Sequence, residues 1–102
     1  MADEKLVRDF VPKIIEQSGK NINVHVVEGN DFFEKLKDKL KEEVDEFVSD
    51  EAIEELADIL EIVYLLSKYK GVSPEKLEEF RQFKSKERGS YEKGFVLEKK
   101  PL

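Results

Sequence analysis

The sequence predicts an all-α protein in which four helices form a bundle. Apolar residues recur every three or four positions in four successive segments, which is the period of a helix with one buried face. Glycine, or serine followed by proline, separates several of these segments, and such residues end or begin helices. Of the 102 residues, 41% are charged and 39% hydrophobic, a composition typical of a helix-rich soluble protein. We expect a single domain, residues 1–102, with a modest core.

The first half of the chain contains two predicted helices. The first runs from about residue 8 to residue 17, and the glycine two residues later ends it. Residues 23–28 (NVHVVE) are few and rich in β-branched side chains, so we expect a strand or an extended linker. A long helix follows and continues to about Val48. Asp31, with Glu34 three residues later, has the pattern of a capping box at its start.

The second half contains the most hydrophobic segment. After a break at Ser49-Asp50, a third helix is predicted over residues 51–70, apolar on two sides, and such a helix is buried on two sides. In so small a domain this indicates contact with a partner subunit. A serine–proline pair then starts a fourth helix, residues 74–87. The sequence also allows a short β element in which residues 94–98 of the tail lie beside residues 23–28.

The bulk properties exclude several classes of function. The net charge of −6 argues against a general nucleic-acid surface. The absence of cysteine excludes disulfides, thiolate catalysis and zinc–sulfur sites. We find no apolar run long enough to span a bilayer and no signal-peptide pattern, so we expect a cytoplasmic protein without a membrane partner.

Two carboxylate pairs with i,i+3 spacing are the most informative feature of the sequence. Glu43 and Glu46 lie in KLKEEVDEF (residues 39–47), and Glu55 and Asp58 lie in EELADILEIV (residues 54–63). The ordinary interpretation of a helix rich in Glu and Lys is a solvated face with i,i+4 ion pairs. Here the carboxylates lie on or beside the apolar stripes instead. An ionised carboxylate turned toward a core costs several kcal/mol unless it is paired or bound to a metal.

The two pairs are expected to face each other, because consecutive helices joined by a tight break are antiparallel neighbours. Four carboxylates cannot neutralise one another, so a cation should lie between them. Ligands that are all oxygen select hard cations, Mg²⁺ first and Mn²⁺ next. A di-iron bundle is the nearest alternative, but it normally needs Glu-x-x-His motifs, and the single histidine, His25, lies outside these helices.

Three motifs resemble one family. The EExxE and ExxD patterns are similar to the metal signature of the MazG-like all-α nucleoside triphosphate pyrophosphohydrolases, which include phosphoribosyl-ATP pyrophosphohydrolases. The opening KLVRDFVPKII (residues 5–15) resembles the KLVRDxIPxII opening of a short-chain branch, and KSKERGSYEKGFVLE (residues 84–98) resembles that branch's KxxERGGFxxxIxLE ending. The similarity covers nearly the whole chain, and it is specific for the branch but not for a substrate. The residues of the two acidic patterns are Glu42, Glu43, Glu46, Glu55 and Asp58.

The resemblance assigns a role to each matched residue. Glu43, Glu46, Glu55 and Asp58 would be the Mg²⁺ ligands. Glu42 would orient or deprotonate water, together with Glu43 as a catalytic group, and Glu61 would be a further ligand or would support one. The basic residues of the two terminal motifs would bind the substrate phosphates; they are Lys5, Arg8, Lys84, Lys86 and Arg88. For the last three, the alternative is a helix end enriched in cations that suit the helix dipole.

The resemblance implies Mg²⁺-dependent hydrolysis of a nucleoside triphosphate between its α- and β-phosphates, in a house-cleaning role, by a homodimer or a tetramer. Such chemistry needs no nucleophilic side chain, which agrees with the lack of a plausible triad. Only eight residues separate Glu46 from Glu55, fewer than in many relatives, where a longer loop contributes to nucleotide selection. Two alternatives stay open: a phosphoribosyl-ATP pyrophosphohydrolase of histidine biosynthesis, and a non-catalytic helical module that binds nucleotide or protein.

Overall fold

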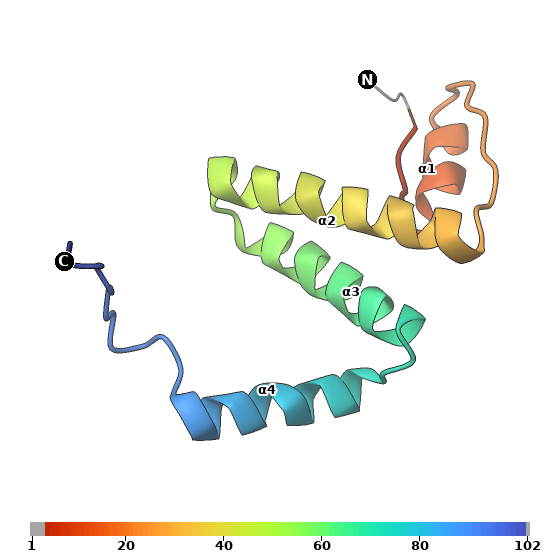
Figure 1. Cartoon of the computed structure of the whole chain (residues 1–102). Coiled ribbons are helices and arrows are strands. Elements are labelled where there is room, and N and C mark those ends of the chain that lie inside the picture. Colours follow the sequence, from red (N-terminus) through yellow and green to blue (C-terminus); the bar gives the residue numbers. More distant parts are fainter. Residues whose placement is uncertain (1–3, 102) are drawn as a thin grey trace.

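The computed structural model describes residues 4–101 and contains, within that range, four α-helices and no strand (Figure 1). The all-α class predicted from the sequence is therefore confirmed. The helices are α1 (Val11–Gln17), α2 (Gly29–Asp50), α3 (Ile53–Tyr69) and α4 (Pro74–Arg88).

The starts of α2 and α4 are made in different ways. At α4, the predicted serine cap is present, because the Ser73 hydroxyl accepts a hydrogen bond from the backbone N–H of Lys76 at 3.1 Å. At α2, the predicted capping box of Asp31 and Glu34 is wrong. The helix begins two residues earlier, without a side-chain cap, because Gly29 makes the turn into it with a φ of 57°.

The break between α2 and α3 lies slightly later than the sequence predicts. Glu51 ends α2 in the left-handed conformation, with a φ of 57°, and its N–H donates to the carbonyl of Phe47 at 2.7 Å. Only a short link then precedes α3. The two helices consequently run back along each other as an antiparallel hairpin (Figure 1).

This α2–α3 hairpin holds the small core. Within the described residues, the buried hydrophobic side chains are Leu36 of α2, which is fully buried, and Ile62 of α3. At the far end of the hairpin the rings of Phe33 and Tyr69 stack, with centroids 4.5 Å apart. Burial of apolar surface between α2 and α3 is therefore the main stabilising contact of a single chain.

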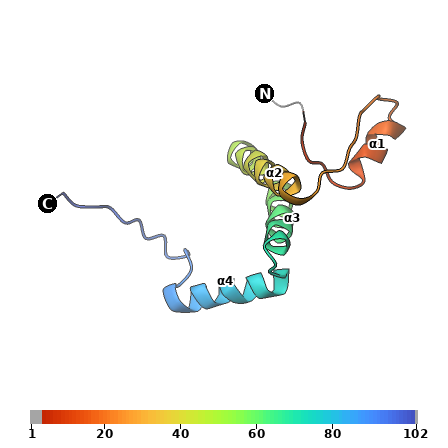
Figure 2. The ribbon, with the colours of Figure 1, turned by 45° about the vertical axis from the view of Figure 1, so that its right-hand side comes forward.

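The remaining helices extend away from the hairpin. In both ribbon views α4 leaves the end of α3 at a wide angle, and α1 stands at the opposite side of the molecule (Figures 1 and 2). The molecule measures 60 × 31 × 28 Å, with a radius of gyration of 18.0 Å. A compact chain of this length has a radius of gyration of about 13 Å. The single chain is thus an open arrangement of helices.

The β element that the sequence left open is not formed. Residues 23–28 and 94–98 have no strand structure, and the two segments lie at opposite ends of the molecule in Figure 1. Val26 and Phe95 are both more than four-fifths exposed, so neither segment has an apolar surface to pack on. An isolated two-stranded pair is at best marginally stable in water.

No helix within residues 4–101 has both the length and the apolarity that a membrane crossing demands.

Candidate functional site

The α2–α3 hairpin brings three of the four predicted metal ligands into one acidic cluster, which we define as Glu43, Glu46 and Glu55. Glu43 lies on the side of α2 that faces α3 and is only 5% exposed. Glu55 of α3 is half-buried, and Glu46, one turn after Glu43, is exposed. The cluster therefore opens from the buried interior of the hairpin to the solvent.

The charges in the cluster repel each other. The negative charge of Glu43 is the main cause of the raised pKa of Glu46. The pKa of Glu55 is raised first by lost hydration and then by the charges of Asp50 and Glu46. One oxygen of Glu43 and one of Glu55 (Oε2 in each) are buried and have no hydrogen-bond partner within the described residues. Two acceptors in this cluster are therefore left unsatisfied.

Lys39 supplies part of the missing positive charge. Its Nζ lies 3.2 Å from Oε1 of Glu43 and 3.0 Å from Oε2 of Glu42. Burial of Lys39 opposes its charge, but the hydrogen bonds to Glu42 and Glu43 outweigh this, so the pKa of Lys39 is raised. This role of Lys39 was not predicted from the sequence. The signal was present, since Lys39 precedes Glu43 by four residues and Glu42 by three, which places all three on one helix face.

The predicted catalytic residue Glu42 lies beside the cluster in a different environment. The hydrogen bond from Lys39 is the main reason why the pKa of Glu42 is lowered. Lys5, predicted to bind phosphate, also lies 3.5 Å from Oε1 of Glu42. Glu42 is consequently ionised near neutral pH, and it contacts two cations that a nucleotide could attract.

Arg8 and Asp58 were predicted to bind phosphate and metal, respectively, and the structure pairs them with each other. Nη2 of Arg8 donates to Oδ1 of Asp58 at 2.6 Å, and Nη1 lies 3.9 Å from Oε1 of Glu61. The bond to Asp58 is the main cause of the raised pKa of Arg8, and the charge of Glu43 also contributes. Arg8 therefore binds Asp58 and also lies near enough to Glu43 for that charge to act on it.

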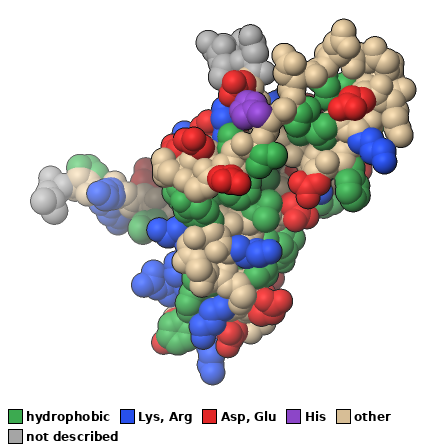
Figure 3. Space-filling model, turned by 90° about the vertical axis from the view of Figure 1, so that its right-hand side faces the viewer, with side chains coloured by type: hydrophobic (Ala, Val, Ile, Leu, Met, Phe, Trp, Pro, Cys, Tyr) green, Lys and Arg blue, Asp and Glu red, His purple; other side chains and the backbone are tan. Residues whose placement is uncertain are grey.

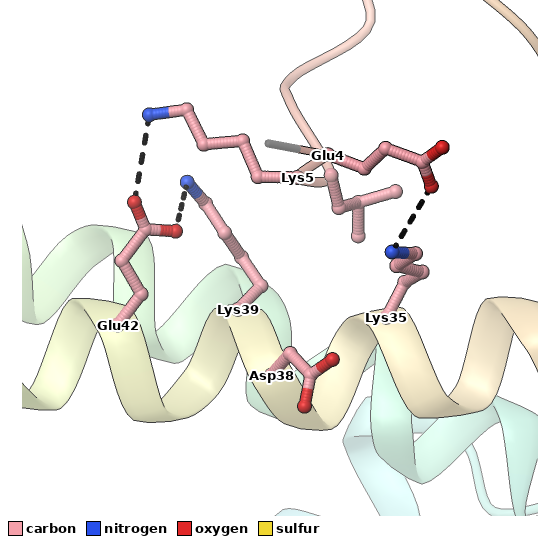
Figure 4. A pocket seen from close by; sticks show the side chains of 7 residues that line it. Glu4, Lys5, Lys35, Asp38, Lys39 and Glu42 are labelled. Atoms are coloured by element: carbon pink, nitrogen blue, oxygen red, sulfur yellow. Dashed lines mark hydrogen bonds and ion pairs between the residues drawn. The ribbon is translucent and has the colours of Figure 1, made fainter. Parts of the chain in front are cut away.

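Residues 4–6 lie along α2 and form a small pocket with it (Figure 4). This pocket has a volume of about 270 Å³ and is lined by acidic and basic side chains together with Leu6. Lys35 pairs with Glu4 at 3.4 Å, and Lys5 and Lys39 both approach Glu42 (Figure 4). Lys5 and Arg8 of the N-terminal segment thus lie at the edge of the acidic cluster.

The basic residues at the end of α4 are not brought to this site within one chain. The ion pairs of α4 in the described part of the chain are local ones, Lys76 with Glu79 and Arg81 with Glu78. The C-terminal end of α4 points away from the hairpin in both ribbon views (Figures 1 and 2). The predicted phosphate-binding residues of this helix end, Lys84, Lys86 and Arg88, therefore lie apart from Lys5 and Arg8.

The cluster is not arranged as a finished coordination sphere. Within residues 4–101, no three Asp, Glu or His side chains stand together at metal-ligating positions, and the exposed His25 lies on the segment before α2. The donor set nevertheless fits a hard cation, because it consists of carboxylates and two of its buried oxygens have no partner. A divalent ion would have to replace Lys39 at Glu43 and Arg8 at Asp58.

Comparisons with protein-family models, with curated proteins and with solved structures found no match. Function is therefore inferred from the residues and geometry of the chain itself.

Proposed function

We propose that the protein hydrolyses a nucleoside triphosphate, or a related nucleotide, to the monophosphate and pyrophosphate in the presence of Mg²⁺. The observation that carries this proposal is the buried carboxylate of Glu43, whose second oxygen has no partner and which lies beside Glu46 and Glu55. Such a carboxylate destabilises a metal-free protein. A site that accepts this cost is typical of one that binds a cation.

The carboxylates of the acidic cluster would hold the ion, joined by Asp58 after it releases Arg8. Mg²⁺ bound there would lower the pKa of an attacking water and offset the charge of the phosphates. Glu42, kept ionised by Lys39, is available to accept a proton from that water. This assignment needs no nucleophilic side chain.

The cations that now contact carboxylates would turn to the substrate. When an ion neutralises Asp58, the guanidinium of Arg8 is free to bind a phosphate through two parallel hydrogen bonds. Lys5, which is 63% exposed in its side chain and contacts Glu42 at 3.5 Å, can shift toward a phosphate at small cost. The N-terminal segment would thus exchange carboxylate partners for phosphate partners.

Pyrophosphate release from a panel of nucleoside triphosphates tests the proposal. The wild type should release pyrophosphate with Mg²⁺ and not with a chelator. Glu43→Gln, which keeps size and shape, should lose at least about 100-fold in rate, since even residues that only support metal ligands cost about 10–100-fold. Glu34→Gln is the matched control, an exposed glutamate of the same helix paired with Lys37 at 2.6 Å, and should leave the rate unchanged.

The same panel separates the alternatives. Phosphoribosyl-ATP is included, and turnover of it alone would assign the protein to that reaction. A non-catalytic module is the second candidate, favoured by the ion pairs that Arg8 and Lys39 already make with the carboxylates. That candidate predicts nucleotide or Mg²⁺ binding without pyrophosphate release. Equal rates of pyrophosphate release in Glu43→Gln and the wild type would refute the assignment of the acidic cluster as the Mg²⁺ site.

A further inference from the structure

The joint between α3 and α4 is a short link, residues 70–73. Gly71 makes the turn with a φ of 82°, and apart from its chain neighbours no atom of the described residues lies within 4 Å of the place of a Cβ. The hydroxyl of Ser67 donates to the carbonyl of Val72 at 2.7 Å, and the N–H of Val72 donates to the carbonyl of Ser67 at 2.9 Å. These bonds tie Val72 to α3, whereas Ser73 caps α4. The angle between the helices is therefore set by the few backbone dihedral angles between Val72 and α4, and such a hinge can absorb a large rotation.

Apolar side chains stand at matching positions on the two helices. Counted outward from the middle of the link, three apolar residues of α3 each have an apolar residue of α4 at the same separation; the pairs are Leu66 with Leu77, Val63 with Phe80, and Leu60 with Phe83. The members recur every three residues, so on each helix they share one side. Antiparallel packing of α4 on α3 would therefore place apolar side chains against apolar side chains.

The open structure brings only the inner pairs near each other. Four of the side chains line part of an open, mainly apolar groove of about 280 Å³ at the joint; they are Val63, Leu66, Leu77 and Phe80. The outer pair is uncovered, because Leu60 is 48% exposed and Phe83 is 63% exposed. The space-filling view shows hydrophobic side chains reaching the surface between charged ones on the face that it draws (Figure 3). Covering the outer pair would stabilise the chain, since apolar surface is the main source of stability.

The charges of the two helices match in the same register. Glu55 lies 14 positions before the last residue of α3, and Arg88 lies 14 positions after the first residue of α4, which is about 21 Å along each helix. Within residues 4–101, Arg88 is in no ion pair, and the buried Oε2 of Glu55 has no hydrogen-bond partner. Glu43 differs, because Lys39 lies 3.2 Å from its Oε1. Glu55 is therefore the member of the acidic cluster at which a cation of α4 is expected.

We propose that α4 is a hinged lid, which closes within one chain by folding back along α3 and places its basic end over the acidic cluster. Closure buries the three apolar pairs and brings the guanidinium of Arg88 to the unsatisfied oxygen of Glu55, with Lys84 one turn away. Antiparallel helices are typically joined by about two to five residues, so the link of residues 70–73 is long enough. This inference does not rest on the proposed function, because it follows from the register and charges of one chain.

Distances between spin labels test the closure. The chain has no cysteine, so Glu54→Cys on α3 and Lys86→Cys on α4, both at exposed positions, provide the two labelled sites. The labelled chain is diluted in an excess of unlabelled chain, so that only distances within one chain are measured. The labelled positions lie about 22 and about 18 Å from the joint, and packed helices lie about 8–10 Å apart. Double electron–electron resonance should therefore show two populations, the closed one at least about 10 Å shorter than the open one.

A charge on the outer apolar pair should remove the shorter population. Phe83→Glu is suitable because Phe83 is 63% exposed in the open structure, so the α2–α3 hairpin does not depend on it. Phe10→Glu is the matched control, since Phe10 is 79% exposed and precedes α1, and it should leave both populations unchanged. A labelled chain that shows the open distance alone, or a shorter population that persists in Phe83→Glu, would overturn the proposal.

Cross-linking of the wild type distinguishes closure within a chain from contact between copies. Light and heavy isotope-labelled chains are unfolded and refolded together and then treated with a carbodiimide, which joins a lysine to a carboxylate that it contacts. A link between Lys84 and Glu55 should join peptides of the same isotope. Absence of this link, or links of mixed isotope between these residues, would contradict closure within one chain.

Discussion

Replacing Lys39 with alanine should lower the free energy of unfolding of the metal-free protein by about 3 kcal/mol. Lys39 is the cation that contacts Glu43 in the described residues, with Nζ 3.2 Å from Oε1. Without it, a carboxylate whose side chain is only 7% exposed has no partner for either oxygen. Loss of one member of a buried pair costs about 3–5 kcal/mol. The lower end applies because the side chain of Lys39 is itself 16% exposed.

The assay is urea unfolding followed by circular dichroism, at one protein concentration, in a chelator and at neutral pH. Lys37→Ala is the matched control on the same helix. Lys37 pairs with Glu34 at 2.6 Å, but both side chains are about half exposed, and such pairs contribute about 0–1 kcal/mol. Its position over the Phe33 ring, at 4.6 Å, adds about 0.5–1 kcal/mol. The control should therefore lose about 1 kcal/mol.

Mg²⁺ should reverse the effect of Lys39→Ala. An ion that occupies the place of the ammonium group binds the variant without first displacing a lysine, so the variant should bind Mg²⁺ more tightly than the wild type. At a Mg²⁺ concentration 100 times the dissociation constant, the folded state gains about 2.7 kcal/mol, which would restore most of the loss. If Lys39→Ala lost no more stability than Lys37→Ala, or gained none with Mg²⁺, the role of Glu43 as a carboxylate that needs a cation would be refuted.

Three further predictions follow from the described geometry. Leu36→Ala should lower the free energy of unfolding by about 2–5 kcal/mol, because Leu36 is the fully buried side chain of the small core. Urea unfolding measures this change. A loss below about 1 kcal/mol would contradict the packing of Leu36 in the core. Because the pKa values of Glu46 and Glu55 are raised in the folded protein, the free energy of unfolding of the metal-free protein should fall as pH rises from 4.5 through the raised values. Thermal unfolding over this pH range should show this fall in chelator and a smaller fall in Mg²⁺. A free energy of unfolding that rises over this range would contradict the repulsion between the carboxylates. Arg8→Ala should change the free energy of unfolding by only about 0–1 kcal/mol, because its ion pair with Asp58 is partly exposed. The same variant should have a higher KM for the nucleotide. An unchanged KM in steady-state kinetics would refute the assignment of Arg8 to phosphate binding.

The helices could be predicted from the sequence because each depends on local information. Apolar spacing predicted all four, and the serine–proline pair predicted the start of α4, where Ser73 caps the helix. The capping box at Asp31 and Glu34 failed because Gly29 allows an earlier turn into α2. The β element failed for a different reason. The composition of residues 23–28 cannot show whether a partner strand lies within reach, and here the tail runs to the other end of the molecule.

The site could be predicted only in part. The i,i+3 spacing and the antiparallel hairpin place Glu43, Glu46 and Glu55 close enough for their charges to repel one another. The pairing of Arg8 with Asp58 joins residues 50 positions apart, and no local pattern shows which of several partners a long side chain selects. The angle between α3 and α4 is equally hidden from the sequence, so the separation of the basic end of α4 from the acidic cluster could not be predicted.

Two cations of the chain offset part of the repulsion between its carboxylates. Lys39 pairs with Glu43 of the acidic cluster, and Arg8 pairs with Asp58, while the second oxygen of Glu43 stays unsatisfied. A divalent ion that entered this site would have to displace Lys39 from Glu43 and Arg8 from Asp58.

Calorimetric titration of Mg²⁺ into the metal-free protein is the most direct measurement of whether the acidic cluster is a cation site. We expect saturable binding to the wild type and its loss in Glu43→Gln, with both proteins equally helical by circular dichroism. Identical titration curves for the two proteins, or a wild type that binds no Mg²⁺, would contradict it.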